Sequence, residues 1–267
     1  FVSSSVSARI AQKFLHLLKG ETLMSCKFSL MAAVCGLLMM AGSSAFAVVL
    51  ATDNFSYPDG ALVPNGGWAN QSGTAGTLLV ASGEAVVTQD SGSEDAELVV
   101  GPEFTTGVMI ANFDIRVTVP DPNVGIVGTD FEYFAHFSND TSFNFQSRLD
   151  VVAPTAGGDY TLGLASNSST NEVNLPVDFA FGATVPVELR WDFTTGLASV
   201  TAGGNTVVST TVDLGETLDS FNLRQSSSSS DETIFVDNLV VSHVPEPATL
   251  ALMLFGLAGI GASRRRS

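Results

Sequence analysis

Apolar and polar side chains alternate one by one along several stretches between residues 48 and 243. In residues 185–193, Val, Leu, Trp and Phe occupy every second position, and Pro, Glu, Arg and Asp lie between them. Residues 112–119 and 143–150 repeat this pattern. A period of two places one face of a β-strand on a core and the other in water. The pattern therefore predicts three half-buried strands, and it places Trp191 in the core.

Shorter segments rich in β-branched and apolar residues fill the remainder of this region. Gly, Asn, Asp and Pro clusters separate them, as expected of turns, and the serine run 226–230 is interpreted as a flexible loop. No amphipathic helix of ten or more residues is evident in 48–243. Many short strands at this spacing are typical of an all-β fold, and we expect one antiparallel β-sandwich or jelly roll. The additional expected strands are 78–81, 85–88, 97–100, 131–137, 160–165, 206–212, 221–224 and 233–241.

The region before residue 48 has the layout of a secretory signal peptide. Met24 is the better start, because Lys27 then gives a short basic segment and residues 28–40 give an apolar core. Ala45-Phe46-Ala47 has the small-x-small pattern of a cleavage site, so we expect a signal peptide at 24–47 that is cut after Ala47. A transmembrane helix is the alternative. Residues 1–23 are either untranslated sequence upstream of the start or a long basic extension of the signal.

Composition changes once both ends are set aside. Residues 48–247 hold 26 acidic residues and four arginines, a formal charge of −22, and no lysine. Both cysteines, Cys26 and Cys35, lie in the predicted signal peptide, so the mature domain must rely on its core instead of disulfides. This negative charge argues against nucleic acid as a partner. It indicates either a solvated acidic surface or one that attracts divalent cations.

The segment 244–267 has three parts in order. Val244-Pro245-Glu246-Pro247 comes first, the uncharged stretch 248–262 follows, and Arg264, Arg265 and Arg266 come last. Fifteen helical residues span about 22 Å, which is short against a hydrocarbon layer of about 30 Å. The arginines favour a transmembrane helix with its end in the cytoplasm and the body outside. A helix buried in the domain is the alternative, but three glycines and the lack of a polar face disfavour it.

These features resemble the PEP-CTERM sorting signal of Gram-negative bacteria that export polysaccharide. The resemblance implies recognition by an exosortase, a transpeptidase-like membrane enzyme, and processing near Pro245, Glu246 and Pro247. It also implies a transient stay in the inner membrane and delivery to the cell surface or extracellular matrix. The resemblance is confined to 244–267 and does not extend to the body.

A second resemblance concerns the two ends of the body. Residues 53–57 (Asp-Asn-Phe-Ser-Tyr), followed by Gly66-Gly67-Trp68, are similar to the start of concanavalin-like jelly-roll domains, and 235–241 is similar to their last strand. The resemblance implies that the first and last strands lie side by side. It also implies a structural calcium ion in some relatives, with Asp237 as ligand and Asp53 nearby; no other cofactor is expected. Since calcium takes about six to eight oxygen ligands, the alternative is that both aspartates flank strands.

No stretch of the body forms a recognisable catalytic motif. Glu94-Asp95-Ala96-Glu97 reads as an acidic loop entering a strand, and the Glu-x-Asp-x-x-Glu string of laminarinase-like jelly rolls is absent. Glycoside hydrolysis requires two carboxyl groups across a cleft. His136 alternates with an apolar face, so we expect it to point outward or to pair within a sheet. The sequence therefore predicts a protein that is not an enzyme.

Aromatic residues leave carbohydrate binding open. Trp68 lies in a glycine-rich loop, where it would either contact a glycan or plug one end of the sandwich, and Tyr57, Tyr133 and Tyr160 are also able to stack on sugars. The favoured function is a non-catalytic surface or matrix protein associated with exopolysaccharide or biofilm. A lectin-like module and a secreted glycoside hydrolase of jelly-roll type are the alternatives, and the missing carboxylate string counts against the hydrolase.

Overall fold

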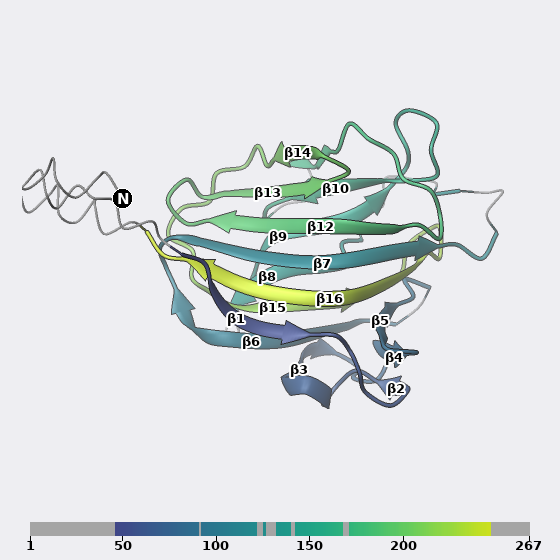
Figure 1. Ribbon diagram of the computed structural model, residues 1–267, viewed down its shortest axis with the longest axis horizontal. Coiled ribbons are helices and arrows are strands. Elements are labelled where there is room, and N and C mark those ends of the chain that lie inside the picture. The colour runs from purple at the N-terminus through teal and green to yellow at the C-terminus, as the bar shows by residue number, and fades with distance from the viewer. Residues whose placement is uncertain are drawn as a thin grey trace, which may run out of the picture. The chain divides into compact units, whose positions relative to one another are not determined.

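Two β-sheets make up the part of the chain that the structure describes (Figure 1). This computed structural model describes residues 46–90, 92–121, 125–126, 132–139, 142–167 and 171–246. A 3₁₀ turn, η1 (Asn65–Gly67), lies within these ranges. None of the described segments forms a helix that is long and apolar enough to cross a bilayer. The predicted signal peptide up to Ala45 and the apolar stretch 248–262 lie outside the described residues.

The first sheet has nine strands in the order β14-β13-β12-β7-β16-β5-β4-β2, and β1 pairs with β16 beside them. Its strands pair antiparallel throughout. In Figure 1, β12, β7, β16 and β1 form the front layer. The members of this sheet are β1 (Val48–Asp53), β2 (Gly60–Ala61), β4 (Leu79–Ala81), β5 (Glu84–Val87), β7 (Val108–Thr118), β12 (Thr184–Asp192), β13 (Leu197–Ala202), β14 (Asn205–Val208) and β16 (Thr233–Val244).

The second sheet has seven strands in the order β11-β10-β9-β8-β15-β6-β3, and these pairs are also antiparallel. The chain passes from one sheet to the other between some consecutive strands, such as β6 and β7, as in a β-sandwich. The members of this sheet are β3 (Trp68–Gly73), β6 (Glu94–Phe104), β8 (Ala135–Asn139), β9 (Ser142–Val152), β10 (Thr161–Ala165), β11 (Val173–Asn174) and β15 (Leu218–Gln225).

A single hydrophobic cluster fills the space between the sheets and draws residues from both. The three predicted half-buried strands correspond to β7, β9 and β12, and in β12 buried and more exposed positions alternate along the strand. Trp191 is fully buried, which confirms its predicted place in the core. Burying each large apolar side chain of this kind contributes about 1.5–3 kcal/mol, so this cluster takes the place of disulfides.

The structure contains strands that the sequence pattern does not predict. β1 and β13 are two of them, and the inward residues of β13 are Ala198, Val200 and Ala202, whose small side chains give a weak hydrophobic period. β6 begins at Glu94, the first residue of the acidic run, and not at residue 97 as expected. Glu94 and the next residue already pair with β15. The expectation of an acidic loop at this point is therefore wrong.

The first and last strands of the domain lie side by side, as the resemblance to concanavalin-like domains implies. β1 pairs with β16 from Val48 opposite His243 to Asp53 opposite Leu239. β5 pairs with residues 234–236 of β16, while β7 pairs along most of its length. β16 therefore joins the two ends of the domain to the middle of the first sheet.

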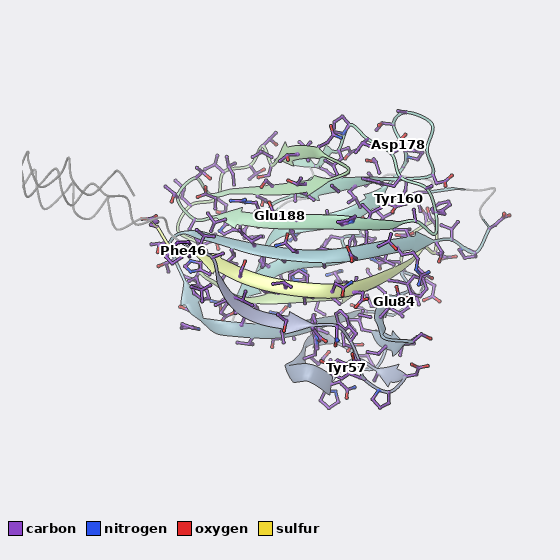
Figure 2. All side chains as sticks on the ribbon, viewed as in Figure 1. Phe46, Tyr57, Glu84, Tyr160, Asp178 and Glu188 are labelled. Carbon is purple, nitrogen blue, oxygen red and sulfur yellow. The ribbon has the colours of Figure 1, made fainter. Side chains whose placement is uncertain are left out.

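Asp53, at the end of β1, ties this strand to the second sheet. Its Oδ1 accepts hydrogen bonds from the Phe55 amide (2.7 Å) and the Tyr57 hydroxyl (2.9 Å), and its Oδ2 accepts one from Nε1 of Trp68 in β3 (2.8 Å). Burial raises the pKa of Tyr57 to about 12, and the hydrogen bond to Asp53 and its charge add to the shift. Tyr57 lies near β2 and β3 (Figure 2). A Cβ on Gly66 (φ +59°) would collide with the Tyr57 hydroxyl, so this contact requires glycine there.

We expect Asp53→Ala to lower the free energy of unfolding by about 2–4 kcal/mol, because it leaves buried donors, among them Nε1 of Trp68, without an acceptor. Urea denaturation of the variant measures this change. Asp59→Ala is the matched control, since Asp59 is exposed and accepts one hydrogen bond, from the Ser82 amide (2.8 Å). Equal effects of the two substitutions would contradict the role assigned to Asp53.

Candidate functional site

Trp68 is part of the core and is not an exposed loop residue. Its side chain is 2% exposed, stacks near Phe55 (ring centres 6.1 Å apart) and meets the ring of Phe221 edge-on. Its indole nitrogen is held by Asp53. The expectation of glycan contact through Trp68 is corrected, because a covered ring offers no face to a sugar; the alternative, a plug inside the sandwich, describes what is observed.

Asp53 and Asp237 lie on opposite faces of the first sheet. Asp53 is 7% exposed and sits opposite the buried Leu239, whereas Asp237 is partly exposed and sits opposite Asp114 of β7. The geometry thus does not bring the two proposed calcium ligands together. Within the described ranges, no group of three or more His, Cys, Asp or Glu side chains is placed to hold a metal ion.

The outward face of the second sheet carries the most unusual group of polar side chains. Core-facing residues such as Ala135 of β8 and Leu149 of β9 alternate with polar residues that point away from the core. Neighbouring strands pair Arg224 with Asp95 and align Asn222 with His136. We call four of these side chains, together with Phe145 of β9 and the loop residue Tyr133, the arginine–tyrosine cluster. Its members are Asp95, Tyr133, His136, Phe145, Arg148 and Arg224.

Tyr133 is the centre of this cluster, and two guanidinium groups lie against its ring. The Cζ atoms of Arg148 and Arg224 are 4.8 Å and 4.6 Å from the ring centre. Nη1 of Arg224 also donates a hydrogen bond to the Tyr133 hydroxyl (2.9 Å). Burial raises the pKa of Tyr133, although the two arginines oppose that shift. The tyrosine is therefore a neutral acceptor and an aromatic support for two cations.

Arg148 makes no ion pair and no hydrogen bond through its side chain within the described part of the chain. Its guanidinium instead lies near the rings of Tyr133 and Phe145, the second at 5.5 Å. Burial lowers the pKa of Arg148. Arg224 has one carboxylate near it, Asp95, at 3.7 Å. Both cations are thus poorly neutralised, in a body where acidic residues outnumber arginines 26 to four.

His136 lies beneath these cations and is fully buried. Its ring meets Tyr133 edge-on at 5.2 Å and Phe145 at 4.7 Å, and neither ring nitrogen has a hydrogen-bond partner among the described residues. Burial, reinforced by the charges of Arg148 and Arg224, lowers its pKa well below the ordinary range. The imidazole is therefore neutral at pH 7 and keeps one donor and one acceptor unused. The residue does face outward as predicted, but its complete burial was not foreseen.

Sequence reasoning named Tyr133 and His136 singly and did not join them to the two arginines. The available signal was the identical spacing Tyr133-x-x-His136 and Phe145-x-x-Arg148, combined with the rarity of arginine in a lysine-free body. That signal does not reveal that β15 lies next to β8, which is what brings Arg224 to the same place.

The charge on this face changes sign along β9. Asp150, two residues after Arg148, is 1% exposed, and burial raises its pKa well above the ordinary range, with further contributions from Glu172, Glu232 and Glu132. Burial also raises the pKa of Glu172 and of Glu232. Asp150 pairs with Gly163 of β10, where a Cβ would collide with the carboxylate of Glu172.

A second candidate is a shallow groove on the outward face of the first sheet, across β12, β13 and β14. Its polar side chains largely satisfy each other: Nη1 of Arg190 lies 3.3 Å from Glu188, and the hydroxyls of Thr201 and Thr206 are 2.8 Å apart. Figure 2 labels Glu188 on β12. The one arginine of this groove, Arg190, already has a carboxylate partner. The groove is therefore a weaker candidate for a ligand site than the arginine–tyrosine cluster.

The start of the predicted sorting motif belongs to the folded domain. β16 continues to Val244, which pairs with Val108, and Glu246 accepts a hydrogen bond from the Thr194 hydroxyl (2.9 Å). Nε2 of His243 lies 2.7 Å from the Thr106 carbonyl oxygen. The remaining motif residues, Pro247 and Arg264–Arg266, lie outside the described residues.

Comparison with known proteins identifies the C-terminal segment and the fold. Residues 243–267 match the PEP-CTERM protein-sorting motif, so the chain carries this motif as expected. No curated protein sequence matches the chain at a significant level. A sialidase is similar in structure at 15% identity and a TM-score of 0.50, over 74% of this chain and 19% of its own.

Further similar structures include lectins and an enzyme. Peanut lectin matches at 14% identity and a TM-score of 0.48, over 74% of this chain and 97% of the lectin. A mutant alginate lyase in complex with an alginate tetrasaccharide matches at 16% identity and a TM-score of 0.48, over 74% and 97% of the two chains. At such low identities the likeness concerns the fold alone. The predicted antiparallel sandwich of jelly-roll type is confirmed.

We expect Asp150→Asn to raise the free energy of unfolding at pH 7, because the folded state disfavours the ionised carboxylate that the unfolded state carries freely. A raised pKa means that the folded state holds the proton more tightly than the unfolded state. The stability from this proton is fully present below the ordinary pKa of an aspartate and is lost as the pH rises through the raised value. The variant should therefore lose less stability between about pH 4 and 7 than the parent chain. Urea denaturation at several pH values measures this.

Asp178→Asn is the control of opposite sign. Asp178 is exposed, and hydrogen bonds from the backbone amides of Thr155, Gly158 and Ala156 hold its pKa at about 2 (Figure 2). A lowered pKa stabilises the folded state above the ordinary value, so this substitution should lower stability at pH 7. If both variants change stability in the same direction, the electrostatic account of Asp150 is wrong.

Proposed function

We propose that this chain is an exported, non-catalytic protein that an exosortase sorts to the cell surface or extracellular matrix, where it associates with exopolysaccharide. One observation carries the proposal. The sorting motif matched at 243–267 begins inside β16, so the last strand of the sandwich leads directly into the sorting signal. An enzyme that acts near Pro245, Glu246 and Pro247 would thus release or attach the whole sandwich as one unit.

Composition and topology support an extracellular role. The body has no cysteine and a formal charge of −22, which favours a soluble domain that needs no redox chemistry. β1 begins at Val48, immediately after the predicted cleavage point at Ala47, so removal of the signal peptide would leave the first strand intact. Both processing points would then lie at the same end of the β1–β16 pair.

The lectin-like alternative is compatible with this sorting and adds a function for the body. It is favoured by the arginine–tyrosine cluster, where aromatic rings, two poorly neutralised cations and an unsatisfied histidine gather on one sheet face. The hydrolase alternative has less support. Glu94 belongs to the acidic run, and its Oε2 already accepts hydrogen bonds from the Thr77 amide, the Thr77 hydroxyl and the Leu78 amide.

Deletion of residues 247–267 should leave the sandwich folded, because the last strand ends at Val244. In a host with an exosortase, we expect the truncated protein to leave the surface fraction and appear in the medium or periplasm. Cell fractionation with immunodetection measures its distribution. The exposed body variant Asp178→Asn serves as control and should be sorted like the parent chain. Unchanged surface retention of the truncated chain would overturn the sorting role.

A further inference from the structure

We infer that the arginine–tyrosine cluster binds the carboxylate of an acidic sugar, so that the polysaccharide partner of this protein contains uronic acid residues. This inference rests on the proposed association with polysaccharide and specifies its chemical class. It assigns Arg148 and Arg224 as the residues that recognise the acid group.

Arg148 is the first reason. A partly buried guanidinium without an anionic partner loses hydration, and contact with aromatic rings compensates this loss only in part. Acidic side chains are abundant in this body, yet none lies within ion-pair distance of Arg148 in the described ranges. A cation kept free of partners in such a chain is placed to receive an anion from outside.

The second reason is the pairing of two cations on one ring. Arg224 lies against Tyr133 as Arg148 does, and its hydrogen bond to the tyrosine hydroxyl fixes its orientation. Its side chain is 22% exposed, so part of it can reach a ligand. Guanidinium groups match the planar geometry of a carboxylate and bind it through paired hydrogen bonds. Two of them against one ring form a positive site in an otherwise negative protein.

His136 is an independent sign that the protein alone does not complete this site. Buried polar atoms in native proteins nearly always have a partner, but both ring nitrogens of this fully buried residue lack one among the described residues. The same holds for Nε of Arg148 and of Arg224. Unsatisfied donors and acceptors therefore concentrate in the arginine–tyrosine cluster, around the two partly exposed guanidinium groups that an anionic ligand would reach.

The surrounding carboxylates explain why the site would select for one acid group. Asp95 is buried and held by the Ser72 hydroxyl (2.7 Å), which keeps its carboxylate beside Arg224. Asp150 lies two residues further along β9, where burial and the nearby Glu172 and Glu232 raise its pKa, so a second anion is disfavoured there. A polymer with regularly spaced carboxylates and neutral hydroxyl groups between them suits this pattern better than one with densely placed sulfate groups.

Binding measurements with the full-length chain, kept in a non-ionic polyoxyethylene detergent, test the inference. The probes are the uronic acid polymers polygalacturonate, alginate and hyaluronate, with carboxyl-reduced polygalacturonate, dextran and dextran sulfate for comparison. We expect at least one uronic acid polymer to bind, and Arg148→Gln and Arg224→Gln each to weaken it about tenfold or more. Arg190→Gln is the matched control, because Arg190 also lies on a strand but belongs to the first sheet, where it pairs with Glu188 of the same strand. This variant should bind like the parent chain.

The outcomes separate this inference from the proposed function. Binding of dextran or the reduced polymer at equal strength, unchanged in both arginine variants, would overturn the acidic-sugar site and leave the polysaccharide role standing. Equal, arginine-dependent binding of dextran sulfate would replace the uronate site with a general anion site. Failure of all three uronic acid polymers to bind also overturns the inference, while sorting is judged separately by the truncation. Thermal melting of each variant, with Arg148→Lys as a variant that keeps the charge, excludes loss of folding as the cause.

Discussion

The antiparallel pairing of β16 with β1 and β7 is the interaction on which the rest of this structure depends. One edge of β16 pairs first with β5 and then with β1, while β7 occupies the other edge. Because β1 is the first strand and β16 the last, the domain is closed only when the chain is complete. The buried carboxylate of Asp53 extends this closure to the second sheet through Trp68.

This closure also determines how the sorting segment leaves the domain. Val244 is still a ladder residue, and Glu246 is held by Thr194 two residues later. The folded body and the sorting motif are therefore continuous, without a flexible linker between the last strand and Glu246. A sorting enzyme that acts near Glu246 would act next to the end of β16, in a domain whose core does not depend on disulfides.

The two faces of the second sheet obey different constraints. Its inner face joins the common core, so apolar packing specifies it and small errors cost stability. Its outer face buries charged and polar groups that the described residues satisfy incompletely. Burying Asp150 and Arg148 without ion partners costs stability, and such a cost is typical of functional sites rather than of structural ones. The pairing of β16 with β1 and β7 adds to the stability of the domain and offsets this loss.

The alternation of residues in 112–119, 143–150 and 185–193 was sufficient to predict three long strands and the burial of Trp191, because period-two patterning reports the local burial of each side chain. The spacing of the many short strands and turns was sufficient to predict the sandwich fold. The linear order of the C-terminal motif was sufficient to identify the sorting signal. Short strands with small inward residues, such as β13, gave too weak a period to be predicted.

Which distant residues meet was decided by the tertiary structure alone. The sequence places Trp68 in a glycine-rich loop. In the structure its indole nitrogen donates a hydrogen bond to Asp53, fifteen positions earlier, and the ring lies in the core. Tyr133, Arg148 and Arg224 form one site because β8 lies between β9 and β15, an order that no local pattern encodes. Sequence periodicity reports on which side of a strand a residue lies; strand pairing between remote segments, driven by closure of the whole core, determines what it lies against.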